Sequence, residues 1–82
     1  MITVSIYGKQ DCCLCTEAEK MINDLGKEYP LDIKKIDITE DAKLIEMYRY
    51  LIPVVVINDT IKFELKISRY RVEKAIRAAC TK

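Results

Sequence analysis

Alternating apolar and polar residues mark the first element of the chain. Residues 2–7 alternate in this way, which is typical of a half-buried strand. The apolar residues Leu14, Ala18, Met21, Ile22 and Leu25 follow at helical spacing and predict a helix. Gly26 is a suitable C-terminal cap for this helix, and Pro30 prevents the helix from continuing.

A second strand is predicted over residues 31–38, but its apolar residues change face along it. Leu31 and Ile33 share one face, whereas Ile36 and Ile38 share the other. A bulge at the two intervening lysines, or a strand that begins late, would account for this change. A second helix should follow, capped by Thr39 and with its apolar face formed by Ala42, Ile45, Tyr48 and Leu51.

The last third of the chain predicts two strands and a helix. Residues 54–57 are apolar without polar alternation, which is typical of a strand covered on both faces. Asn58 and Asp59 predict a tight turn, and alternation over residues 61–67 predicts a half-exposed edge strand. Ser68 can cap a final helix, whose inner face would carry Val72, Ile76, Ala79 and Cys80.

The predicted element order is therefore β-α-β-α-β-β-α. Its first strand–helix–strand unit requires a right-handed crossover between parallel strands. The tight turn makes the last two strands an antiparallel hairpin. We therefore expect an α/β fold in which a mixed four-stranded sheet has helices on both faces.

Length and composition narrow the class of protein. A chain of 82 residues fits a single domain spanning residues 1–82. The net charge is +1, from 14 basic and 13 acidic residues, and gives no reason to expect a nucleic-acid or membrane partner. The N-terminal residues lack the basic segment and continuous apolar run of a signal peptide, and Pro53 interrupts the longest apolar run. We expect a cytoplasmic monomer without a bound cofactor.

Three of the four cysteines lie within four positions, at Cys12, Cys13 and Cys15. The C-x-x-C pair, Cys12 and Cys15, falls where the first strand gives way to the first helix. The unpaired N–H groups and the dipole of a helix N-terminus favour a thiolate there; Lys9 adds to this effect and Asp11 opposes it. One helical turn brings the two side chains to one edge. The pair therefore suits thiol–disulfide exchange, in which one thiolate attacks and a second thiol releases the product.

Other roles for the cysteines stay open. The absence of histidine excludes Cys/His and Ser/His catalysis and any histidine metal site. Cys13 is best explained as a passive residue facing solvent, although a third redox thiol or a metal ligand is an alternative. The second candidate function is a metal or iron–sulfur cluster carrier using Cys12, Cys13 and Cys15, with the fourth thiolate supplied by a second chain or an outside thiol. Cys80 is expected to be a small buried hydrophobe.

Two motifs resemble the thioredoxin superfamily, and its short glutaredoxin-like branch most of all. They are the run from Tyr7 to Cys15, with its Cys-x-Leu-Cys ending, and the run from Leu51 to Asp59 around Pro53. The resemblance implies a thioredoxin-like fold and a dithiol oxidoreductase. Its substrate would be a disulfide-containing protein or a small thiol compound, and its electron donor glutathione or a reductase.

The same resemblance assigns roles to individual residues. Cys12 would be the attacking thiolate and Cys15 the resolving thiol. A cis peptide bond would precede Pro53, which would lie beside the cysteines, and the backbone of Ile52 would pair with the substrate. Lys9 matches a lysine that glutaredoxins use near the glutathione carboxylate.

One segment departs from the glutaredoxin pattern. Glutaredoxins usually carry a Gly-Gly pair after the fourth strand, whereas residues 64–68 of this chain all have full side chains. Because glycine lets a ligand approach the backbone closely, this difference predicts weak dependence on glutathione. The dithiol chemistry itself does not depend on this segment.

Overall fold

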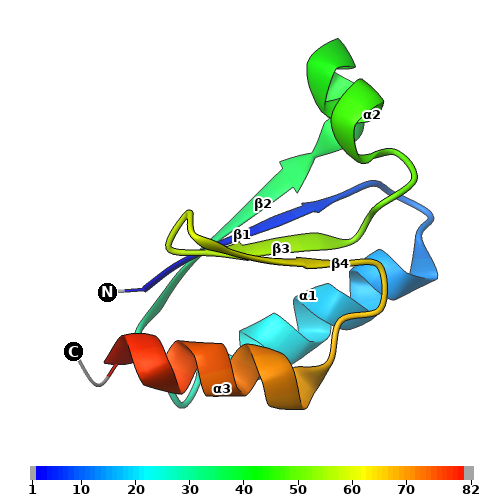
Figure 1. Ribbon diagram of the computed structural model, residues 1–82. Coiled ribbons are helices and arrows are strands. Elements are labelled where there is room, and N and C mark those ends of the chain that lie inside the picture. The colour runs from blue at the N-terminus through cyan, green and yellow to red at the C-terminus, as the bar shows by residue number, and fades with distance from the viewer. Residues whose placement is uncertain (1, 81–82) are drawn as a thin grey trace.

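Four strands form one mixed sheet in the order β2-β1-β3-β4 in a computed structural model that describes residues 2–80 (Figure 1). The elements are β1 (Ile2–Gly8), α1 (Cys13–Leu25), β2 (Leu31–Asp37), a 3-10 turn η1 (Ile38–Glu40), α2 (Ala42–Tyr48), β3 (Val54–Ile57), β4 (Ile61–Glu64) and α3 (Arg69–Cys80). The predicted order of strands and helices is confirmed. The predicted domain also includes Met1, Thr81 and Lys82, which lie outside the described residues.

Strand directions follow from the connections between the strands. β1 and β2 are parallel, with Ile2 opposite Leu31, and α1 forms the crossover between them. β3 is antiparallel to both β1 and β4. Residues 58–60 connect β3 to β4, and Ile57 pairs with Ile61. Asn58 and Asp59 have φ 52° and 59°, the positive values that the two central residues of a type I′ turn require. The predicted hairpin is therefore confirmed.

Helices cover both faces of the sheet. α1 and α3 lie together on one face, where they bury a first core of Ile2, Val4, Ile6, Ile22, Leu25, Val55, Ile57, Val72 and Ile76 (Figure 1). α2 lies on the other side and contributes Tyr48 to a second core of Cys15, Ile38, Tyr48, Ile52 and Val54, against which Tyr7 and Cys12 also pack. The second core contains the resolving cysteine of the sequence prediction.

The two-sided sheet explains why the apolar residues of β2 change face. β1 and β2 pair residue for residue from Ile2–Leu31 to Gly8–Asp37, so the predicted bulge is wrong and the strand does not begin late. Ile33 packs against the first core, and Ile38, just beyond the strand, belongs to the second. The chain therefore crosses from one core to the other without interrupting the hydrogen-bonded ladder.

The second helix is shorter than predicted, and Thr39 does not cap it. The Asp37 carboxylate instead accepts hydrogen bonds from the Thr39 N–H at 2.9 Å and the Thr39 hydroxyl at 2.6 Å, which closes the turn η1. Asp41 then caps α2 by accepting a hydrogen bond from the Lys43 N–H at 2.8 Å. Aspartate is among the best N-cap residues, so two aspartates divide this segment into a turn and a helix.

The fourth strand ends three residues earlier than predicted. Leu65 adopts φ 61°, which breaks the extended conformation. Its N–H donates to the carbonyl oxygens of Leu51 and Pro53 at 2.9 and 3.1 Å. The segment after β4 is thereby held against the loop that precedes β3.

Cys80 is exposed, so its predicted burial is wrong. Val72 and Ile76 of α3 are fully buried, and Ala79 packs against the first core. At 3.6 residues per turn, Cys80 lies about 80° around the helix from Val72, whereas Ala79 lies only about 20° away on the other side. The last residue of α3 therefore falls at the margin of the buried stripe.

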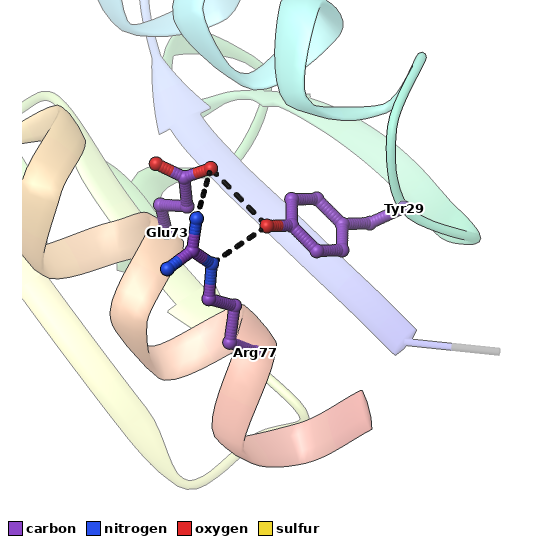
Figure 2. Close-up of polar contacts among 3 residues, drawn as sticks. All are labelled: Tyr29, Glu73 and Arg77. Carbon is purple, nitrogen blue, oxygen red and sulfur yellow. Dashed lines mark hydrogen bonds and ion pairs between the residues drawn. The ribbon is translucent and has the colours of Figure 1, made fainter. Parts of the chain in front are cut away.

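A polar contact fastens the end of α3 to the loop between α1 and β2 (Figure 2). The Tyr29 hydroxyl donates to the Glu73 carboxylate at 3.1 Å and accepts from Nε of Arg77 at 2.9 Å. Arg77 also forms an ion pair with Glu73 at 3.5 Å.

Among residues 2–80, no helix combines the length and apolar character needed to span a membrane.

Candidate active site

The loop between β1 and α1 places Cys12 at the start of the helix. Asp11 has φ 62°, a left-handed conformation that aspartate adopts more readily than most residues. Cys12 follows as the N-cap residue with extended backbone angles, φ −111° and ψ 109°. The chain therefore turns sharply from strand to helix at the first cysteine of the pair.

The sulfur of Cys12 itself caps the helix. Sγ accepts a hydrogen bond from the Cys15 N–H at 3.3 Å. The Cys12 carbonyl oxygen accepts from the N–H and the hydroxyl of Thr16 at 3.0 and 3.1 Å. Because Cys12 is partly exposed, a substrate can reach a sulfur that a main-chain N–H already orients.

Cys15 differs from Cys12 in both burial and protonation. It is only 4% exposed and belongs to the second core. Burial raises the pKa of the Cys15 thiol to about 11, and a hydrogen bond with Cys12 acts in the same direction, while a backbone hydrogen bond from Lys9 opposes it. Cys15 is therefore a protonated thiol near neutral pH, shielded from solvent and hydrogen-bonded to Cys12.

Gly8 is a site residue that the sequence analysis missed. A Cβ atom at Gly8 would lie 3.0 Å from Sγ and 3.1 Å from Cβ of Cys15. Gly8 does not have a positive φ, so space for Cys15, rather than backbone conformation, requires glycine here. The sequence offered only its position at a strand end, which does not reveal a contact with a residue seven positions later.

The other two cysteines lie outside this pair. Cys13 is exposed, as predicted for a passive residue, and Cys80 is exposed on α3. Within residues 2–80, no three cysteine, aspartate or glutamate side chains are grouped so that they could hold a metal ion. The geometry of one chain therefore does not support the metal-carrier alternative, and a site shared between two chains stays a prediction.

The loop before β3 borders the same core as the cysteines. The Ile52–Pro53 peptide bond is cis, as the resemblance implied. Ile52 packs in the second core with Cys15, and Pro53 is fully buried between Ile52 and Val54. The Ile52 N–H donates to the Tyr48 carbonyl oxygen at 3.1 Å. A substrate strand would have to displace that bond or pair with the Ile52 carbonyl oxygen.

Lys9 is exposed in the loop between β1 and α1. It lines a cavity of about 360 Å³ together with Gly8, Gln10, Asp11, Thr16, Glu19, Lys35, Ile36 and Asp37. Its main-chain N–H, by contrast, donates a hydrogen bond to the sulfur of Cys15, which lowers the pKa of that thiol. The predicted contact of Lys9 with a glutathione carboxylate stays a prediction.

The segment that replaces the glycine pair faces the first helix across a groove. Leu65, Lys66 and Ile67 line one side of this groove, whose volume is about 460 Å³, and Leu14 and Met21 of α1 line the other. The Leu65 side chain is 48% exposed. Full side chains therefore occupy the place where glycines would leave the backbone open to a ligand.

Comparisons with known proteins agree with this geometry. Residues 3–77 match the family model described as a Glutaredoxin-like domain. Similar solved structures include thioredoxin 1 from Thermosipho africanus, at 20% identity and a TM-score of 0.78, with 96% of this chain and 94% of that chain covered.

Two further solved structures are similar. A variant thioredoxin from Halobacterium salinarum is 16% identical at a TM-score of 0.77, covering 94% of this chain and 73% of that chain. A target protein from X. campestris is 20% identical at a TM-score of 0.77, covering 92% of this chain and 96% of that chain. These similarities establish the thioredoxin fold, as predicted. No curated protein sequence matches the chain.

Proposed function

Because the chain belongs to the Glutaredoxin-like domain family, we propose that it is a dithiol–disulfide oxidoreductase acting through Cys12 and Cys15. One observation carries the proposal. A partly exposed cysteine caps the helix by accepting a hydrogen bond from the main-chain N–H of a buried cysteine one turn later. Exchange chemistry needs this division between an accessible attacking sulfur and a shielded resolving sulfur.

The reaction proceeds in two exchanges. The Cys12 thiolate attacks one sulfur of the substrate disulfide, a mixed disulfide forms, and the other substrate sulfur leaves as a thiolate that takes up a proton. Cys15 then loses its proton and attacks Sγ of Cys12, which releases the second substrate thiol. Two electrons have passed to the substrate, and a Cys12–Cys15 disulfide remains for an external thiol reductant to reduce.

The reductant is proposed to be a protein or other dithiol, with glutathione used weakly. Lys9 and the Ile52 backbone would supply part of a glutathione site. Leu65, Lys66 and Ile67 would crowd the remainder, because their side chains stand where glycine would admit the ligand. The ammonium of Lys66 would act in the opposite direction, because it could replace lost main-chain contacts to a glutathione carboxylate.

The test is reduction of a disulfide substrate in two coupled assays, one with glutathione and glutathione reductase and one with thioredoxin reductase. Cys12→Ser should abolish turnover in both assays, whereas the matched variant Cys13→Ser should retain it. Retained turnover in Cys12→Ser together with loss in Cys13→Ser would show that the roles are assigned wrongly. Turnover with glutathione comparable to that of an ordinary glutaredoxin would contradict the proposed reductant.

A further inference from the structure

The charges of this chain are distributed unevenly between its two parts. Residues 61–80 contain six basic and two acidic residues, a net charge of +4, whereas the rest of the chain contains eight basic and eleven acidic residues, a net charge of −3. The overall charge of +1 conceals this separation. The basic part comprises β4, which is an edge strand of the sheet, α3, which lies below β4 in the view of Figure 1, and the segment that joins them.

A groove of about 690 Å³ runs through this basic part. Three cations line it: Lys62 from β4, Lys66 from the connecting segment and Arg71 from α3. Glu64 is the single acidic residue in its lining, and Phe63, Ile67 and Ser68 complete it. The three cationic residues are all exposed, and the lining combines a net charge of +2 with the apolar residues Phe63 and Ile67.

The cations of the groove are not neutralised by the protein's own carboxylates. Ion pairs among residues 2–80 join Lys27 and Arg69 to Asp24, and Arg77 to Glu73. None of them involves Lys62, Lys66 or Arg71. The charges that line the groove are therefore available to a ligand, whereas neighbouring arginines on α3 already have partners.

One end of the groove lies beside the core that holds the cysteine pair. The Lys62 ammonium lies 5.2 Å from the centre of the Tyr48 ring. Tyr48 belongs to the second core with Cys15, and Cys12 packs against that core. A ligand that contacts Lys62 in the groove would therefore lie near Tyr48, in the core against which Cys12 packs.

We propose that the groove docks an acidic segment of the substrate protein whose disulfide Cys12 attacks. This inference rests on the proposed oxidoreductase function and adds the substrate class. A protein segment fits better than a nucleic acid, because the groove has apolar as well as basic lining and β4 is an edge strand with which an extended peptide can pair. Unpaired cations attract acidic segments and repel basic ones, which gives specificity.

The test compares three peptides that contain the same internal disulfide and are flanked by aspartates, serines or lysines. At about 0.01 M salt, we expect kcat/KM for the aspartate peptide to exceed that for the serine peptide about tenfold, and the lysine peptide to be the poorest substrate. At about 0.5 M salt the three values should converge, because exposed charges are then screened.

Charge-removing variants locate the effect. The triple variant Lys62→Gln, Lys66→Gln, Arg71→Gln should lose the preference for the aspartate peptide. The prereduced variant should still reduce the serine peptide in a single turnover, which requires no external reductant. The matched control Lys27→Gln, Lys34→Gln, Lys43→Gln removes the same charge from other exposed surfaces and should retain the preference. Equal kcat/KM for all three peptides with the unaltered protein, or equal loss of the preference in both triple variants, would overturn the inference.

Binding without chemistry separates this inference from the proposed function. Fluorescence anisotropy with an aspartate-flanked peptide whose cysteines are replaced by serines measures binding to the groove without disulfide exchange. One outcome is that the unaltered protein binds this peptide and the groove variant does not, although the unaltered protein reduces no disulfide peptide. That result would refute the oxidoreductase function and support the groove as a binding site for acidic segments. Tighter binding of a single-stranded oligonucleotide of equal charge at the same groove would overturn the assignment of a protein partner.

Discussion

The contact between Gly8 and Cys15 leads to the sharpest prediction about the site. In Gly8→Ala, the new methyl group would lie 3.0 Å from Sγ of Cys15, whereas non-bonded carbon atoms prefer about 3.5–4.0 Å, so Cys15 or the end of β1 must move by roughly 0.5 Å. Overpacking of this kind costs about 1–3 kcal/mol, and alanine returns about 0.4–1 kcal/mol by restricting the unfolded chain. We expect the free energy of unfolding to fall by about 1–2 kcal/mol.

The same displacement should impair the second exchange more than the first. Attack by Cys12 should proceed at the rate of the unaltered protein, because Gly8 contacts Cys15 and not the attacking sulfur. Release of the mixed disulfide by Cys15 should slow about tenfold, since a small misplacement of a reacting group is costly. Stopped-flow measurement of both steps with a chromogenic disulfide distinguishes them.

Two controls make the prediction decisive. Gly26→Ala also meets close neighbours, at 3.2 Å from Ile33, but lies at the far end of α1 and should leave both exchange steps unchanged. In a Cys15→Ala background the nearer of the two contacts is gone, so Gly8→Ala should cost less stability there. An unchanged release rate in Gly8→Ala, or an equal loss of stability in both backgrounds, would refute the steric role of Gly8.

Three further predictions concern protonation, the glycine-free segment and the C-terminal helix. Burial raises the pKa of Cys15 to about 11, and Cys15 stays buried in the mixed disulfide. In a stopped-flow pH series, the rate of release by Cys15 should therefore rise from about pH 7 to 9, approaching tenfold per pH unit. A plateau of this rate near neutral pH would contradict the prediction. Leu65→Gly removes a leucine with a left-handed backbone conformation and opens the groove between the segment after β4 and α1, so coupled assays should show faster turnover with glutathione. Thermal unfolding should show a stability within about 1 kcal/mol of the unaltered protein. Unchanged turnover would refute the argument that these side chains crowd glutathione. Tyr29→Phe removes the hydroxyl that bonds both Glu73 and Arg77 and should lower the midpoint of urea unfolding. The control Tyr70→Phe, at an exposed tyrosine, should leave the midpoint unchanged. Equal midpoints for the two variants would show that the contact contributes nothing to the stability of the fold.

Strong local patterns made most of the fold predictable from sequence. The alternation of β1 and the helical spacing of α1 each satisfy one period only. The apolar run of β3 is short and is bounded by Pro53 and a turn, which favours a strand over a helix. Two of the predictions that were wrong concern places where a specific contact overrides the pattern. Asp37 and Asp41 cap the second helical segment in place of Thr39, and the backbone of Leu65 ends β4 by bonding the loop before β3.

The candidate site was predictable only where its chemistry is local in sequence. The spacing of Cys12 and Cys15 placed both thiols at a helix N-terminus, because one helical turn joins them. The close approach of Gly8 to Cys15 depends on how β1 packs against α1, which no spacing reveals. The uneven distribution of charge is visible in the sequence, but the groove requires β4 and α3 to be brought together.

The most direct test of the central claim is to trap the mixed disulfide in Cys15→Ser and locate it by mass spectrometry of the digested protein. Without the resolving thiol, the first exchange should stop at a stable adduct, and the account predicts that the substrate thiol is attached to Cys12. Addition of a small dithiol should release it. An adduct carried mainly by Cys13 or Cys80, or no adduct while Cys12 remains free, would contradict the assignment of Cys12 as the attacking thiolate.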